Sequence, residues 1–117
     1  MTGQRLVLTS AALLALAQPA FAHHGWSDYD NATLTAVTGV VQEYQFGNPH
    51  GVITLLADGE ELTATLAPPS RMERAGMGAD SVAVGDTVTV EGHVNLSDPH
   101  EMKIKRVVVG DEAYQLY

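Results

Sequence analysis

The chain has 117 residues, no cysteine, and 14 acidic against six basic residues, which gives a formal net charge of −8 at pH 7. Such an acidic chain repels phosphate backbones and its basic residues form no long run, so nucleic acid is not an expected partner. Without disulfides, an exported domain of this size must be stabilised by core packing alone or with help from a metal or a partner.

The first 22 residues have the features of a secretory signal peptide. An apolar run over residues 6–17 follows a short segment with one positive charge, and it is too short to span a bilayer, which needs about 20 apolar residues. Pro19 ends the run, and Ala20 and Ala22 place small side chains where signal peptidase reads them. We expect cleavage after Ala22, a periplasmic location, no membrane span after cleavage, and a single domain over residues 23–117. The alternative is an uncleaved N-terminal anchor.

Short stretches of alternating apolar and polar residues, rich in β-branched side chains, predict strands along the mature chain. We expect them at residues 34–46, 52–56, 61–66, 87–94, 102–109 and 113–117. Asp58-Gly59 predicts a hairpin between the second and third strands, and Gly39 predicts a bulge or sharp bend in the long first strand. A strand that bends midway suits the corner of a small closed barrel.

One short helix is expected between the third and fourth strands. The prolines at residues 68–69 end the third strand because proline has no N–H for the ladder. Ser70 is then the expected cap of a helix over residues 71–75, with Glu73 completing a capping box. The predicted fold is all-β with one short helix, a small antiparallel barrel of the oligonucleotide/oligosaccharide-binding (OB) type. A β-sandwich is the alternative, because strand number and spacing do not determine connectivity.

The mature N-terminus carries the strongest chemical pattern. After cleavage, the α-amino and ring nitrogens of His23 can chelate one metal ion, and His24 can add its ring and amide nitrogens. One further imidazole would complete the arrangement called a histidine brace, whose nitrogen donors favour Cu(II). His50 is the first candidate for that imidazole because Pro49 restricts the backbone beside it. His100 lies in a looser loop and is the weaker candidate.

Each of these residues also has a purely structural interpretation. Two histidines after a cleavage site can form a polar tail, and the turn around His50 can serve only to redirect the chain. His93 lies inside a predicted strand and is expected on the surface or in the barrel wall. Trp26 and Tyr29 are expected to pack the N-terminal segment onto the barrel rather than to form a ligand cage. The scattered methionines are more typical of core filling than of Cu(I) binding.

Five blocks of the sequence occur together in a recognisable order. They are residues 23–26, 39–41, 48–51, 66–76 and 84–92. These blocks resemble those of a bacterial exported family known only as a domain of unknown function, DUF6152, and the double histidine and the Asn-Pro-His-Gly block are the more specific ones. The resemblance implies a small periplasmic single-domain protein, and it supplies no activity.

Three functions remain compatible with the sequence. The first is periplasmic metal binding, above all of copper, through His23, His24 and His50. The second is a non-catalytic binding module of the envelope for a small molecule, glycan or protein, acting through the concave face and residues 48–51. The third, an enzyme, has the least support, because there is no thiol nucleophile and no serine lies in a recognised nucleophile motif.

Overall fold

The computed structural model describes residues 25–117, so the expected cleavage site and the predicted ligands His23 and His24 lie outside the described residues. The elements follow one another as η2 (Trp26–Asp28), β1 (Thr35–Gln45), β2 (Val52–Ala57), β3 (Glu60–Thr65), α1 (Pro69–Arg74), β4 (Thr87–Val94), β5 (Glu101–Val109) and β6 (Glu112–Gln115). Every predicted strand is present, and so is the α-helix, with bounds that differ by no more than two residues. In this part of the chain no helix has the length and hydropathy needed to cross a bilayer.

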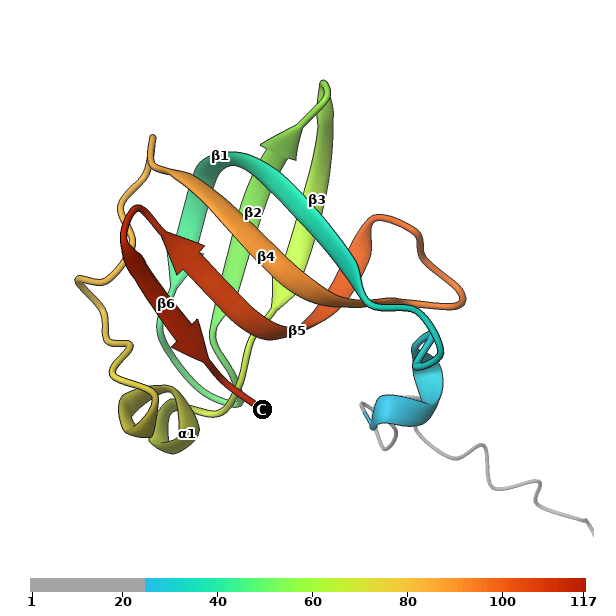
Figure 1. The fold of residues 1–117 in the computed structure, drawn as a ribbon, viewed down its shortest axis with the longest axis horizontal. Coiled ribbons are helices and arrows are strands. Elements are labelled where there is room, and N and C mark those ends of the chain that lie inside the picture. The colour runs from blue at the N-terminus through green and yellow to red at the C-terminus, as the bar shows by residue number, and fades with distance from the viewer. Residues whose placement is uncertain (1–24) are drawn as a thin grey trace, which may run out of the picture.

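The strands form one sheet in the order β3-β2-β1-β4-β5-β6, which closes into a barrel because β3 also pairs with β5 (Figure 1). The first half of β1 pairs with β4 and the second half with β2. The expected OB-like barrel is confirmed, with one correction: it is mixed, because residues 63–65 of β3 run parallel to residues 101–103 of β5. Five strands cannot alternate in direction all the way around a closed ring, so one neighbouring pair must be parallel.

Glycine serves different purposes at two predicted positions. A Cβ on Gly39 would lie 2.7 Å from the carbonyl oxygen of Leu56, so Gly39 lets β2 approach β1 closely. The register shift in β1 falls further along, at residues 41–43, and the bulge predicted at Gly39 is therefore misplaced. Asp58 and Gly59 have φ angles of 50° and 76°, as a tight hairpin with two left-handed residues requires, which confirms the predicted turn.

Alternate strand residues and one face of α1 fill the barrel. The largest fully buried side chains are Val41, Ile53, Leu55, Leu66, Met72, Met77, Val88, Val90, Met102, Ile104, Val107 and Leu116. Met72 from α1 packs at the mouth of the barrel, where its sulfur lies 2.6 Å from the position of a Cβ on Gly51. Three methionines, including Met72, thus belong to the core, as their scattered spacing predicted.

The helix α1 begins at Pro69 rather than after a Ser70 cap. Ser70 lies exposed within the first turn, and no side chain caps the N-terminus. Pro68 is the N-terminal boundary residue, and its carbonyl accepts the N–H groups of Arg71 and Met72. Proline suits the first helical position because its missing N–H needs no partner there. The capping-box prediction is therefore wrong.

Candidate binding site

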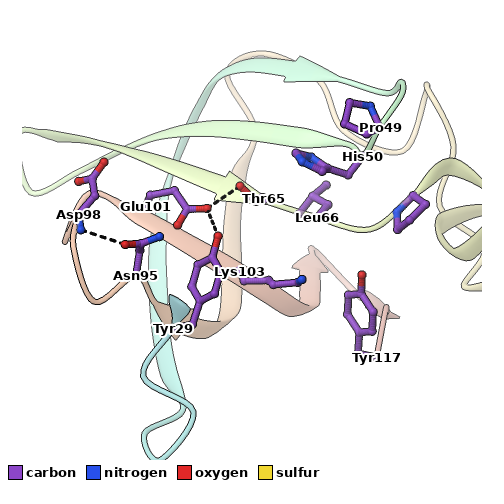
Figure 2. A pocket seen from close by; sticks show the side chains of 11 residues that line it. Tyr29, Pro49, His50, Thr65, Leu66, Asn95, Asp98, Glu101, Lys103 and Tyr117 are labelled. Carbon is purple, nitrogen blue, oxygen red and sulfur yellow. Dashed lines mark hydrogen bonds between the residues drawn. The ribbon is translucent and has the colours of Figure 1, made fainter. Parts of the chain in front are cut away.

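A pocket of about 460 Å³ lies on the outside of the barrel, over the seam where β3 pairs with β5 (Figure 2). Its polar lining comes from His50, Thr65, Asn95, Asp98, Glu101 and Lys103, and the rest from Tyr29, Pro49, Leu66, Pro68 and Tyr117. On β5, Met102 and Ile104 point into the core, so Glu101 and Lys103 point outward. The β1–β2 loop, the β4–β5 loop and the N-terminal segment close over this outer face.

Glu101 is the hydrogen-bonding centre of the pocket. Its Oε1 accepts hydrogen bonds from the Tyr29 hydroxyl at 2.6 Å and from Thr65 Oγ1 at 2.8 Å. Its Oε2 is buried and has no hydrogen-bond partner among residues 25–117. A buried acceptor without a donor is costly, so a donor that reached Oε2 would be stabilised there.

Tyr29 ties the N-terminal segment to this carboxylate. The residue is 6% exposed and forms an isolated antiparallel bridge with Asn95. The pKa of Tyr29 is raised far above its usual value, mainly by burial of the phenol and to a lesser extent by its hydrogen bond to Glu101. Tyr29 thus packs the segment onto the barrel, as expected, and also lines the pocket, which was not foreseen.

Lys103 carries the positive charge of the pocket and lies among aromatic rings. Its Nζ is 4.4 Å from the ring centroid of Trp26, 5.9 Å from that of Tyr117 and 6.0 Å from that of Tyr29. The Trp26 and Tyr117 rings meet edge to face, with centroids 5.0 Å apart. Desolvation lowers the pKa of Lys103, and the nearby charge of Glu101 acts in the opposite direction. Cation–π contacts of this kind hold the ammonium in a defined place.

His50, the first candidate for the third metal ligand, lines the pocket from the β1–β2 loop. It is half-buried, and its Nδ1 is buried without a hydrogen-bond partner among the described residues. The Asn48–Pro49 peptide bond before it is cis. The structure therefore places His50 at the pocket, which polar side chains such as Glu101 and Lys103 also line.

His100, the weaker candidate, lies elsewhere. It lines a smaller hollow beside Glu60, with its Nε2 3.3 Å from Glu60 Oε2, and its side chain is 56% exposed. Its backbone N–H donates to Asp98 Oδ1 at 2.9 Å. His50 and His100 thus line separate hollows, and in residues 25–117 no group of three or more histidine and carboxylate side chains is arranged to hold a metal ion.

His93 is buried in the barrel wall, which is one of the two positions expected for it, and the surface alternative does not hold. Its Nδ1 lies 2.9 Å from the carbonyl oxygen of Asp30 and 2.8 Å from that of Thr33. Two carbonyl acceptors at one nitrogen require that Nδ1 carries the proton. His93 thereby holds the turn after Tyr29 against β4. The alternating pattern of β4 could not predict this contact, because the two carbonyl groups lie some sixty positions earlier in the chain.

Sequence reasoning missed Glu101, Lys103 and Tyr117 as site residues. One signal was present, since two opposite charges at alternate positions of a strand whose other face is apolar share its outer face. Nothing local indicated which loops would cover that face.

Comparison with known proteins gives a family and a fold. The model of DUF6152, a family of unknown function, matches residues 11–102. No protein among those with curated descriptions matches the chain in sequence. The structure is similar to that of the ZRD-deleted mutant of TiaS in complex with agmatine, with 15% identity and a TM-score of 0.54, over 74% of this chain and 27% of that one.

A second similar structure is that of the S. pombe Stn1-ten1 complex, with 18% identity and a TM-score of 0.52, over 68% of this chain and 59% of that one. The chain thus spans less than two thirds of either structure. At these identities the similarity shows a shared fold alone.

Proposed function

The chain belongs to DUF6152, a family of unknown function, and we propose that it is an exported binding module of the bacterial envelope that holds one small molecule over the β3–β5 seam. The observation that carries this proposal is the pocket of about 460 Å³ that Glu101, Lys103 and His50 line. Small-molecule sites are typically concave, partly apolar, and equipped with a few convergent polar groups.

Both the volume and the position of the pocket support this role. Ligand pockets commonly measure about 300–1,000 Å³, so the space accommodates a metabolite-sized molecule. OB-type barrels commonly bind ligands beside the loops that join strands 1 and 2 and strands 4 and 5. Here those two loops supply His50 and Asp98 to the same pocket (Figure 2).

Filling the pocket with a side chain tests the proposal. Pro68 is exposed on the pocket wall, so Pro68→Trp places an indole in the space, while Pro68→Ala is the matched control. Backbone NMR spectra of the exported chain would be recorded with a library of amino acids, sugars, nucleotides and short peptides. We expect saturable shifts at Glu101 and Lys103 with at least one compound, retained in Pro68→Ala and lost in Pro68→Trp. Unchanged binding by Pro68→Trp, or no binding from the whole library, would contradict the proposal.

Copper(II) binding is a second candidate, favoured by the position of His50. The buried Nδ1 of His50 lacks a partner among the described residues, in a pocket that Tyr117 also lines. The ring of Trp26 packs against Tyr117, and His23 precedes Trp26 by three residues, which span at most about 11 Å when extended. We propose His23, His24 and His50 as the ligands.

A competition titration of Cu(II) tests the ligand set. The variants are the native mature chain, a chain with one residue added before His23, His50→Ala, and His100→Ala as the control. The extension converts the α-amine into an amide while every side chain is kept, so affinity should fall, and it should fall independently in His50→Ala. Both ligand types must lose protons, with reference pKa values of about 6.5 and about 7.7–8.0, so affinity should weaken as the pH drops through that range. Equal affinities of the native and extended chains would reject the amine as a ligand.

A further inference from the structure

Two opposite charges are directed to different ends of the pocket. Glu101 and Lys103 leave the same outer face of β5, and their charged groups lie at different places in the pocket (Figure 2). The Glu101 carboxylate faces Tyr29 and Thr65, whereas the Lys103 ammonium extends toward Tyr117. The pocket therefore has an acidic end and a basic end.

The acidic end combines Glu101 with Asp98 from the β4–β5 loop. Glu101 Oε2 has no hydrogen-bond partner among the described residues, and the Asp98 side chain is 61% exposed at the rim. Among residues 25–117, the Tyr29 and Thr65 hydroxyls donate to Glu101 Oε1. The backbone N–H of His100 donates to Asp98 Oδ1, and His100 Nδ1 lies 3.9 Å from the same oxygen. A cationic group is therefore attracted to this end, and more strongly where water is excluded.

The basic end gathers positive charge around two rings. Besides Lys103 on Trp26, the guanidinium of Arg71 lies 4.6 Å from the ring centroid of Tyr117, and Lys105 Nζ lies 5.5 Å from that of Trp26. These are three of the six lysine and arginine residues in a sequence of net charge −8. Such local concentration makes this end an anion-attracting spot on an acidic protein.

The pocket also has an apolar wall, from Pro49, Leu66 and Pro68. We infer that the ligand is a small zwitterion, with an ammonium group at the Glu101 end and a carboxylate at the Lys103 end, of which a free amino acid is the simplest case. The inference rests on the proposed binding function. A ligand with one charge would pair with only one of the two charged side chains. The other charged side chain would lose water to a neutral part of the ligand, at a cost in desolvation.

Three matched probes separate charge from shape. L-leucine carries both groups, 3-methylbutan-1-amine lacks the carboxylate, and 4-methylpentanoate lacks the ammonium. Glycine and L-phenylalanine extend the test to other side chains. Titrated into the exported chain and followed by backbone NMR, at least one amino acid should shift Glu101 and Lys103 saturably. The single-charge analogues of L-leucine should bind about tenfold more weakly, which is the effect of losing one hydrogen bond to a charged group.

Two variants assign the ends. In Glu101→Gln the amide oxygen still accepts from Tyr29, so amino-acid binding should weaken about tenfold while the weak binding of 4-methylpentanoate is kept. Lys103→Met should weaken amino-acid binding about as much while keeping that of the amine. Glu112→Gln and Arg74→Met change the net charge equally at exposed sites outside the pocket, and should leave binding unchanged.

The outcomes distinguish this inference from the function on which it rests. Binding of a single-charge analogue within twofold of L-leucine would overturn the zwitterion and keep the binding module. The same conclusion would follow if no amino acid bound while another library compound shifted the pocket residues. If no compound occupied the pocket, both proposals would fail. The probe series on the native chain needs no variant, so a variant that unfolds does not affect the result.

Discussion

Strand β5 has two neighbours of opposite character. Along β4 it forms an antiparallel ladder that extends from Met102 to Val109, with one register shift and an apolar inner face. Along β3 it pairs only over residues 101–103, in parallel, and the outward side chains there are Glu101 and Lys103. The long ladder with β4 contributes to stability through its buried apolar side chains. The short seam, which closes the barrel, leaves polar side chains on a face that three other segments can cover, and this is where the pocket forms.

The largest expected effect of a substitution on stability is on the inner face of β5, in the core. Ile104 is fully buried on the inner face of β5, so Ile104→Ala should lower the free energy of unfolding by about 2–5 kcal/mol through lost burial and the cavity left behind. Lys105→Ala, its neighbour on the outer face, should cost less than about 1 kcal/mol. Urea denaturation measures both, and similar losses would contradict the assignment of inner and outer faces.

The β4–β5 ladder should also be sensitive to a single methyl group. A Cβ on Gly92 would lie 2.0 Å from the carbonyl oxygen of Lys103, so Gly92→Ala must push the two strands apart. We expect a loss of about 1–3 kcal/mol, as for other overpacked positions. Gly78→Ala is the control, because no atom lies within 4 Å of its Cβ position. A fully stable Gly92→Ala in the same denaturation assay would refute the close approach.

The seam should respond more weakly, through hydrogen bonds. Tyr29→Phe removes one of the two donors to Glu101 Oε1, and the expected loss is about 1–2 kcal/mol. Thr65→Val removes the other donor, and because both share one oxygen their effects should be non-additive in a double-mutant cycle. Tyr114→Phe is the control, on a half-buried tyrosine outside this network. Strict additivity would show that the two hydroxyls act independently.

A pH-dependent effect is expected away from the seam, at Tyr44 of β1. Burial raises the pKa of Tyr44 from 10.0 to about 12, and its hydroxyl donates to the Gly78 carbonyl at 2.7 Å. The folded state therefore holds the phenolic proton more tightly, so the free energy of unfolding should fall as the pH rises from about 10 to about 12. Comparing the melting temperatures of wild type and Tyr44→Phe across this range isolates the contribution of Tyr44. A constant difference between the two proteins would contradict the raised pKa.

Local patterns were sufficient to predict the strands and the α-helix of this protein. The strand at Thr87–Val94 has the predicted bounds, because alternation of period two and the turns around it are properties of consecutive residues. The hairpin at Asp58-Gly59 follows for the same reason. Errors arose where two local rules compete, as at the start of α1, where a serine cap and a proline in the first turn are both compatible with the sequence around Ser70.

The site depended on contacts that no local pattern encodes. The hydroxyl of Tyr29 meets a carboxylate 72 positions later in the chain, and the Nδ1 of His93 meets carbonyl groups 60 and 63 positions earlier. His50 was singled out from its turn, but only the closed barrel brings it to the same pocket as Glu101 and separates it from the hollow of His100. A closed ring of five strands must contain one parallel pair, and here that pair is β3 and β5. The closure of the barrel at this pair determines which distant loops meet over β5.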